Sequence, residues 1–277
     1  MERLKMMNET FAGSAENFLF TCSVILYVLS CLGYIVYSVS KDARMGKWGS
    51  ILIRLAFIGH SLAILFRGIG AGRLPLSNQY EFATGFSWGI ALFYIIFERK
   101  HGDRSLGAFV SPIAFLLIGY AALQNKEIRP LMPALQSGWL GIHVSLAILS
   151  YGGFALACGL SVKYLASGKA DREGHLSPAL LENYSYRLVV VGYVLLTLTI
   201  LTGALWAQKA WGRYWSWDPK ETWSLVTWLI YTAYLHMRKI RNMKGKKAAW
   251  FLVIGFICVI FTYIGVNTLL PSLHSYV

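Results

Sequence analysis

Along this chain, apolar positions are gathered into long stretches without Asp, Glu, Lys or Arg, and short polar segments separate them. An uncharged apolar stretch of about 18 residues or more is typical of a transmembrane helix. Five stretches meet this length: 18–40, 106–123, 137–162, 188–208 and 248–270. The pattern therefore predicts membrane spans and not the core of a soluble protein.

Three further segments complete the predicted bundle. Residues 82–97 and 222–237 are shorter but equally free of charge. Residues 51–69 carry one Arg near each end, where a long side chain can reach the membrane surface. The chain is thus predicted to be an all-α polytopic membrane protein with about eight transmembrane helices. We expect residues 1–277 to form a single integral membrane domain, with no soluble domain and no cleavable signal peptide. The longest connection, 167–186, is expected to contain a short helix that begins near Ser177 and Pro178, where a serine cap followed by proline fits a helix start.

The basic residues are distributed unevenly between the two sides of this bundle. Formal net charge is +13, which could indicate a nucleic-acid partner. However, sixteen Lys and Arg residues fall in the connections on one side and nine on the other. The positive-inside rule places the richer side in the cytoplasm. Both termini and the connection near residue 212 are then expected outside, and no nucleic-acid partner is expected.

The four cysteines give no sign of redox chemistry. Cys22, Cys31, Cys158 and Cys258 all fall in predicted spans and show no CxxC spacing. A disulfide framework is therefore not expected. Small buried apolar residues are the simpler interpretation.

Six of the ten tryptophans lie between residues 206 and 228, around the segment Trp211-Gly-Arg-Tyr-Trp-Ser-Trp-Asp-Pro-Lys-Glu221. A lone interfacial tryptophan, the interpretation given to Trp206, only anchors a helix. Four aromatic residues within seven positions favour a platform for a flat apolar ligand. We call residues 206–222 the tryptophan loop. Its candidate binding residues are Trp211, Gly212, Tyr214, Trp215, Trp217 and Asp218.

Asp218 and Glu221 have a structural interpretation besides ligand binding. Asp218 followed by Pro219 and Glu221 matches a helix start, with an acceptor at the N-cap, proline at N1 and glutamate at N3. Their function could be limited to capping the next helix. Gly212 lacks a side chain and would let a ligand approach the backbone closely.

The predicted topology separates the histidines. His143 and His274 fall at expected outer helix ends, on the side of the tryptophan loop. Such a pair can supply both axial ligands to a haem iron, although a single interfacial histidine is usually only a hydrogen-bonding residue. His60 and His236 lie within spans, where an ionisable residue is either functional or bonded to a neighbouring helix.

The segment from Trp211 to Glu221 resembles the tryptophan-rich "WWD" motif of haem-handling membrane proteins, a superfamily with CcsA/ResC, CcmC and CcmF branches. Two further segments are similar to the CcsA/ResC branch: Pro75-Leu-Ser-Asn-Gln-Tyr-Glu81 and Leu270-Pro-Ser-Leu-His-Ser-Tyr276. The resemblance extends over nearly the whole chain and is least informative in the first 15 residues.

This resemblance implies that His143 and His274 are external ligands of haem b, bound non-covalently and in transit. It implies that His236 belongs to an intramembrane haem site whose second ligand comes from a CcsB/ResB-type membrane partner. His60 has no matching role. The implied function is haem export and attachment to the CxxCH segment of apocytochrome c by the system II route. The implied location is a bacterial plasma membrane or a thylakoid-type membrane.

Several points stay open at the level of sequence. An export-only haem chaperone of the CcmC type would have about six spans. A haem-b electron-transfer subunit would favour histidine pairs inside the membrane. No catalytic acid or base can be assigned, and whether this chain is itself the enzyme is undecided. Five basic residues are candidate partners of the haem propionates: Arg67, Arg73, Lys209, Arg213 and Lys220.

Overall fold

A computed structural model describes the backbone of residues 2–167 and 176–271 and the side chains of residues 11–167 and 176–271. Every regular element in these ranges is a helix, so the all-α prediction is confirmed for the part of the chain that is described. The chain divides into two compact units, Met1–Pro130 and Leu131–Val277.

Seven helical segments within the described ranges are long and apolar enough to cross a membrane. They are Phe11–Ser40, Ala43–Ala71, Gln79–His101, Arg104–Ala122, Gly138–Ala166, Pro178–Trp211 and Lys246–Leu269. Each overlaps one of the predicted stretches, and the chain is an integral membrane protein. The predicted count of about eight is not confirmed. The remaining stretch, 222–237, lies in the helix Pro219–Ile240, which is long enough but less apolar, because many of its residues are Trp, Tyr and Thr.

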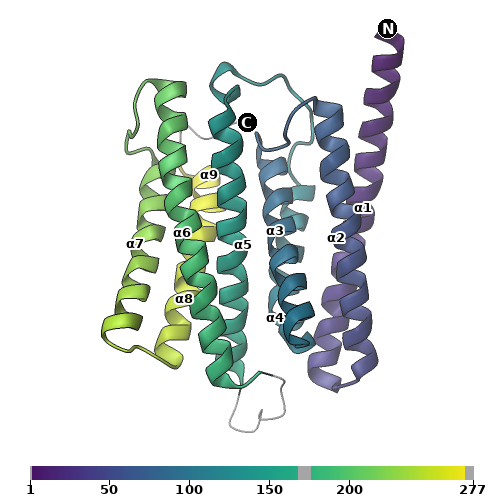
Figure 1. The fold of residues 1–277 in the computed structure, drawn as a ribbon. Coiled ribbons are helices and arrows are strands. Elements are labelled where there is room, and N and C mark those ends of the chain that lie inside the picture. The colour runs from purple at the N-terminus through teal and green to yellow at the C-terminus, as the bar shows by residue number, and fades with distance from the viewer. Residues whose placement is uncertain (1, 168–175, 272–277) are drawn as a thin grey trace. The chain divides into compact units, whose positions relative to one another are not determined.

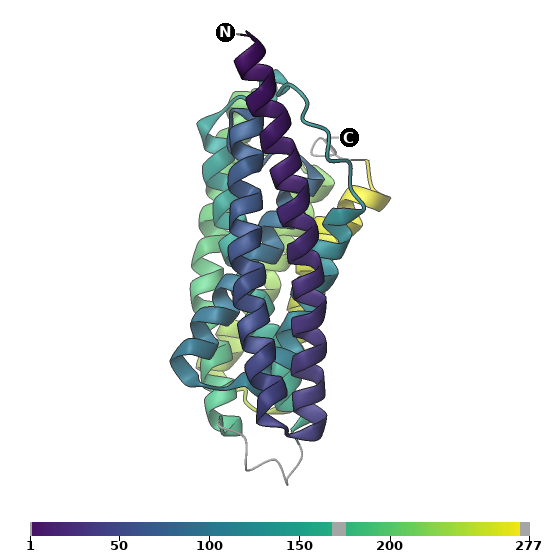
Figure 2. The ribbon, with the colours of Figure 1, turned by 90° about the vertical axis from the view of Figure 1, so that its right-hand side faces the viewer.

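The first unit begins with a long helical hairpin. Its elements are α1 (Glu2–Ser40), α2 (Ala43–Ala71), α3 (Gln79–His101), the short 3₁₀ helix η1 (Arg104–Leu106) and α4 (Gly107–Ala122). The first two helices run side by side (Figure 2). A Cβ added to Gly33 would lie 3.3 Å from Cα of Gly49, so glycines at this crossing let the two backbones approach closely.

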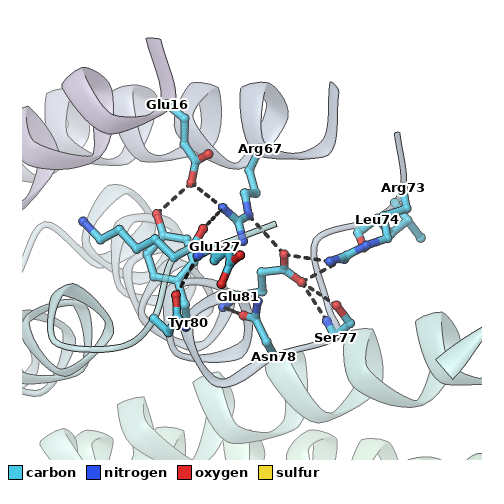
Figure 3. Close-up of polar contacts among 11 residues, drawn as sticks. Glu16, Arg67, Arg73, Leu74, Ser77, Asn78, Tyr80, Glu81 and Glu127 are labelled. Carbon is cyan, nitrogen blue, oxygen red and sulfur yellow. Dashed lines mark hydrogen bonds and ion pairs between the residues drawn. The ribbon is translucent and has the colours of Figure 1, made fainter. Parts of the chain in front are cut away.

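A buried charged cluster joins three helices of the first unit (Figure 3). The Glu81 carboxylate, in the first turn of α3, accepts hydrogen bonds from Arg67 Nε at 3.0 Å and Arg73 Nη1 at 3.0 Å. The amide and hydroxyl of Ser77 also donate to it, at 2.8 and 2.9 Å. Arg67 in turn lies 3.5 Å from Glu16 of α1. Glu81 therefore pairs with two guanidinium groups, the buried one of Arg67 and the partly exposed one of Arg73.

The cluster explains the segment 75–81 that resembles the CcsA/ResC branch. Asn78 is the N-cap of α3, and its side chain accepts the Glu81 amide at 2.8 Å. The Tyr80 hydroxyl donates to Glu16 at 3.0 Å. Polar residues of the segment thus fix the α2–α3 connection to α1.

We expect Glu81→Gln to destabilise the protein strongly. Removing one member of a buried ion-pair network leaves uncompensated charge and costs about 3–5 kcal/mol. The matched control is Glu127→Gln, because Glu127 pairs with Arg129 on the surface with both side chains about 60% exposed. Such a surface pair contributes about 0–1 kcal/mol. Thermal unfolding in detergent measures both variants; equal midpoints would contradict the structural role of the cluster.

The second unit is built around α5. Its elements are the 3₁₀ helix η2 (Pro133–Leu135), α5 (Gly138–Ala166), α6 (Pro178–Trp211), α7 (Pro219–Ile240), α8 (Lys246–Ile260), the π-helical turn η3 (Phe261–Gly265) and α9 (Val266–Leu269). Helix α5 packs along α6 and also contacts α8 (Figure 1). At the centre, the rings of Phe154 and Tyr231 stack with centroids 3.7 Å apart. This packing holds α7 against α5.

The length of α6 differs from the length expected from the sequence. Residues 177–186 were expected to contain a short helix within a connection, followed by a separate span at 188–208. Ser177 is indeed an N-cap and Pro178 the first helical residue, but the helix continues without a break to Trp211. No Gly or Pro lies between residues 179 and 188 to interrupt it.

Candidate functional site

The non-helical part of the tryptophan loop, residues 212–218, has well-defined boundaries at both ends. Gly212 ends α6 in the left-handed conformation, with φ of 76°, and its amide donates to the carbonyl of Gln208. Asp218 begins α7 in a capping box with Glu221, as the sequence predicts. A Cβ at Gly212 would meet nothing within 4 Å. The structure therefore gives Gly212 a conformational role, that of an αL helix cap.

One carboxylate organises the turn before α7. Glu221 Oε2 accepts the amides of Ser216 and Asp218, at 2.8 and 3.1 Å. The residue between these two amides, Trp217, has φ of 59°. The left-handed region is unfavourable for a bulky side chain and persists only where surrounding contacts enforce it. Glu221 therefore holds Trp217 in a conformation that it would not adopt on its own.

The loop aromatics divide into an exposed and a packed group. Trp217 is 68% exposed and Tyr214 57% exposed. The rings of Trp215 and Trp217 lie 5.8 Å apart and are nearly perpendicular, at 88°. One indole can thus present its face to a flat ligand while the other presents its edge. Trp211 instead packs edge-on against Trp206, with centroids 4.8 Å apart.

Trp206 is not an interfacial anchor, and that expectation is wrong. Its side chain is only 1% exposed, and Nε1 donates to the carbonyl of Ala134 in η2 at 2.8 Å. The segment before α5 covers it, so the indole is enclosed within the unit and does not reach the headgroup layer. Trp206 also connects the loop to a histidine, because its ring stacks on His143 at 6.0 Å and 24°.

His143 lies in the second turn of α5, half-buried against α6. Its Nδ1 is 2.8 Å from the backbone carbonyl of Thr199. A carbonyl can only accept, so Nδ1 carries the proton and a neutral ring has its lone pair on Nε2. Metal-bound histidines almost always donate their second nitrogen to a carbonyl or carboxylate in this way. Among the described residues, the geometry thus favours His143 as an iron ligand through Nε2.

The other candidate histidines lie in different surroundings. His236 is exposed, four residues before the end of α7. His60 is fully buried in the first unit, with Nδ1 3.2 Å from the Tyr27 hydroxyl of α1, which supports the interpretation as an interhelical hydrogen bond. His274 lies outside the described residues, so its pairing with His143 stays a prediction.

The five candidate propionate partners are no longer equivalent. Arg67 and Arg73 are bound to Glu81, and Lys209 and Arg213 are exposed. Lys220 stands just before the apolar part of α7, where its Nζ donates to the amide oxygen of Asn267 at 3.0 Å.

These features define an integral membrane protein with an aromatic loop at a helix junction and, beside it, a histidine hydrogen-bonded to a backbone carbonyl through Nδ1. The chain belongs to the family of cytochrome c assembly proteins, which matches residues 76–274. It is 36% identical over 289 residues to the cytochrome c biogenesis protein CcsA of Guillardia theta, covering 95% of each chain. It is 33% identical over 326 residues to CcsA of Synechocystis, covering 95% of this chain and 98% of that one.

A solved structure with a similar fold is that of the cytochrome c haem lyase CcmF, with a TM-score of 0.75 and 16% sequence identity. The match covers 94% of this chain and 47% of that one, so the present chain spans about half the length of CcmF. At this identity the likeness concerns the fold alone.

The sequence did not indicate the roles of three residues that the structure brings to the site. They are Thr199, Gly203 and Glu221, the last through its contacts with the loop amides. A Cβ on Gly203 would fall 2.8 Å from Cε1 and Nδ1 of His143. The available signal was the spacing of Thr199, Gly203 and Trp206, which places them on one face of α6.

Proposed function

We propose that this chain exports haem b and presents it for covalent attachment to apocytochrome c, as the membrane subunit of a cytochrome c synthase. The observation that carries the proposal is the hydrogen bond from His143 to Thr199 beside the tryptophan loop. Family membership supports a role in cytochrome c maturation. The whole chain, 1–277, acts as one membrane domain in this proposal.

The outer site holds haem b non-covalently between His143 and His274. The perpendicular indoles of Trp215 and Trp217 and the exposed Tyr214 contact the porphyrin, while Trp211 packs on Trp206, whose ring stacks on His143. Asp218 and Gly212 set the loop boundaries. Lys220 is the preferred partner for a propionate, because its partly buried ammonium has a neutral amide as its hydrogen-bonding neighbour.

The inner site uses His236, whose exposure on α7 leaves it accessible to a CcsB/ResB-type partner that supplies the second ligand. In this proposal α7 also spans the membrane, which brings the number of spans to eight. The positive-inside rule sets the orientation of the bundle. Both termini and the tryptophan loop then face outward from a bacterial plasma membrane or a thylakoid-type membrane. His60 is left out of the ligand set because it is enclosed in the first unit and bonded to Tyr27.

Thioether formation depends on the positioning of the haem vinyl groups and the thiols more than on acid–base groups. Each thiol of the apocytochrome CxxCH segment adds across a haem vinyl group; sulfur bonds one vinyl carbon and hydrogen the other, so no oxidant is consumed. Holding the porphyrin edge near the thiols supplies much of the rate gain. No residue of this chain is assigned as a catalytic acid or base.

The test is cytochrome c maturation in cells that lack their own pathway. We expect co-expression of this chain, its partner and a CxxCH apocytochrome to give cytochrome c with haem that acid–acetone cannot extract. An apocytochrome with both cysteines changed to serine is the control. Haem delivered outside the membrane without thioether bonds would favour the CcmC-type chaperone. Haem reduced and oxidised in place, without any delivery, would favour an electron-transfer subunit.

A further inference from the structure

We propose that one face of α6 is a seat that positions His143 and fixes which nitrogen it offers to iron. The seat consists of the Thr199 carbonyl, the bare Cα of Gly203 and the ring of Trp206. These residues follow one another at spacings of four and three, which bring side chains to one face of a helix. The inference rests on the proposed function, since it assigns positioning residues to the same haem site.

The Thr199 carbonyl determines the tautomer of His143. It accepts from Nδ1 at 2.8 Å and also from the Thr202 hydroxyl at 3.2 Å. A ring protonated on Nε2 would direct the Nδ1 lone pair at the carbonyl oxygen, and two acceptors would then face each other. The hydrogen bond therefore makes Nε2 the ligand atom. It also raises the basicity of the imidazole as a metal ligand.

Gly203 provides the space that this hydrogen bond needs. A Cβ at position 203 would lie 2.8 Å from both Cε1 and Nδ1 of His143, closer than real carbon contacts allow. The group that must yield is the imidazole ring, since its atoms are the nearest ones. Glycine inside a helix is less favourable than alanine. The contact with His143 is a packing reason for keeping glycine at this position.

Trp206 is the third component of the seat. Its indole lies nearly parallel to the imidazole, at 24°, and is itself held by the Ala134 carbonyl. The indole therefore packs against the imidazole that Thr199 holds. Trp206 also packs against Trp211, so the seat and the tryptophan loop share one packed residue.

The test is Gly203→Ala, purified with the partner and titrated with haem. Loss of an outer-shell contact to a metal-binding histidine costs about 10–100-fold in affinity, and we expect a loss in this range. The bound haem should show a larger high-spin fraction, which added imidazole reverses. The matched control is Gly119→Ala in α4, where an added Cβ meets nothing within 4 Å. Equal affinity and spin state in the unmodified protein and Gly203→Ala would overturn the proposal.

A double variant separates positioning from misfolding. Without the imidazole ring, the Cβ at 203 has nothing to displace, so Gly203→Ala should cause no further loss of haem affinity in a His143→Ala background. Additive losses would overturn the seat. If Gly203→Ala alone does not fold, recovery of folding in the double variant supports the proposal, and failure to recover refutes it. If His143→Ala itself binds haem normally, the proposed outer site is wrong, and the proposal that α6 positions His143 for haem is wrong as well.

Discussion

The His143→Ala protein is expected to lose most of its outer haem, the largest single effect in this account. The substitution removes an axial ligand, so the loss of affinity should exceed the roughly 10–100-fold cost of disturbing an outer-shell partner. The remaining haem should have an open coordination position and oxidise readily. Imidazole at millimolar concentration should restore a six-coordinate spectrum, because it supplies the missing nitrogen without the helix. Haem content and optical spectrum measure both effects.

His236→Ala should fail differently from His143→Ala. It should lower occupancy of the outer site because less haem arrives there, while the haem that does arrive keeps both outer ligands and an unchanged spectrum. The control for loss of a histidine is His101→Gln, at the last residue of α3 and in neither proposed ligand set. Identical spectra and identical haem loss in His143→Ala and His236→Ala would mean one site, and the export route would have to be abandoned.

Trp206→Ala is expected to damage both folding and haem retention. Truncating a fully buried tryptophan typically costs about 3–5 kcal/mol, and here it also removes the ring that stacks on His143. Trp217→Ala should separate the two effects. Its side chain is 68% exposed, so unfolding should be nearly unaffected, whereas a lost aromatic contact of about 1–3 kcal/mol lowers haem affinity roughly 5- to 150-fold.

Thermal unfolding without haem and haem titration distinguish these two tryptophans. The prediction fails if Trp217→Ala unfolds as early as Trp206→Ala, or if Trp217→Ala retains haem as well as the unmodified chain. Trp211→Ala and Trp215→Ala should lie between them, because both side chains are partly buried.

Local patterns in the sequence predicted much of the fold. Apolar stretches with few or no charges located the seven candidate spans, because burying charge in lipid is costly wherever it occurs. The start of α7 was predicted from Asp218, Pro219 and Glu221, because a helix cap depends on neighbouring residues only. The break expected between Ser177 and the span 188–208 was wrong, since nothing in that segment interrupts a helix.

The interior of the site could not be predicted in the same way. The contact between His143 and Thr199 joins residues 56 positions apart, and no local pattern specifies which carbonyl a histidine meets. Trp206 was misinterpreted for the same reason: a tryptophan near the end of an apolar stretch resembles an interfacial anchor unless one knows that η2 covers it. The left-handed conformation of Trp217 likewise follows from the Glu221 contacts and not from its own preference.

The central claim is that this chain binds haem b non-covalently through His143 and His274 next to the tryptophan loop. The most direct measurement is the optical spectrum of the chain purified with its partner, followed by acid–acetone extraction, for the unmodified protein and for the His143→Ala/His274→Ala double variant. The account predicts a six-coordinate low-spin haem that the solvent extracts completely and that the double variant lacks at the outer site. Haem that stays with the polypeptide, or a double variant with the same spectrum and haem content as the unmodified protein, would contradict it.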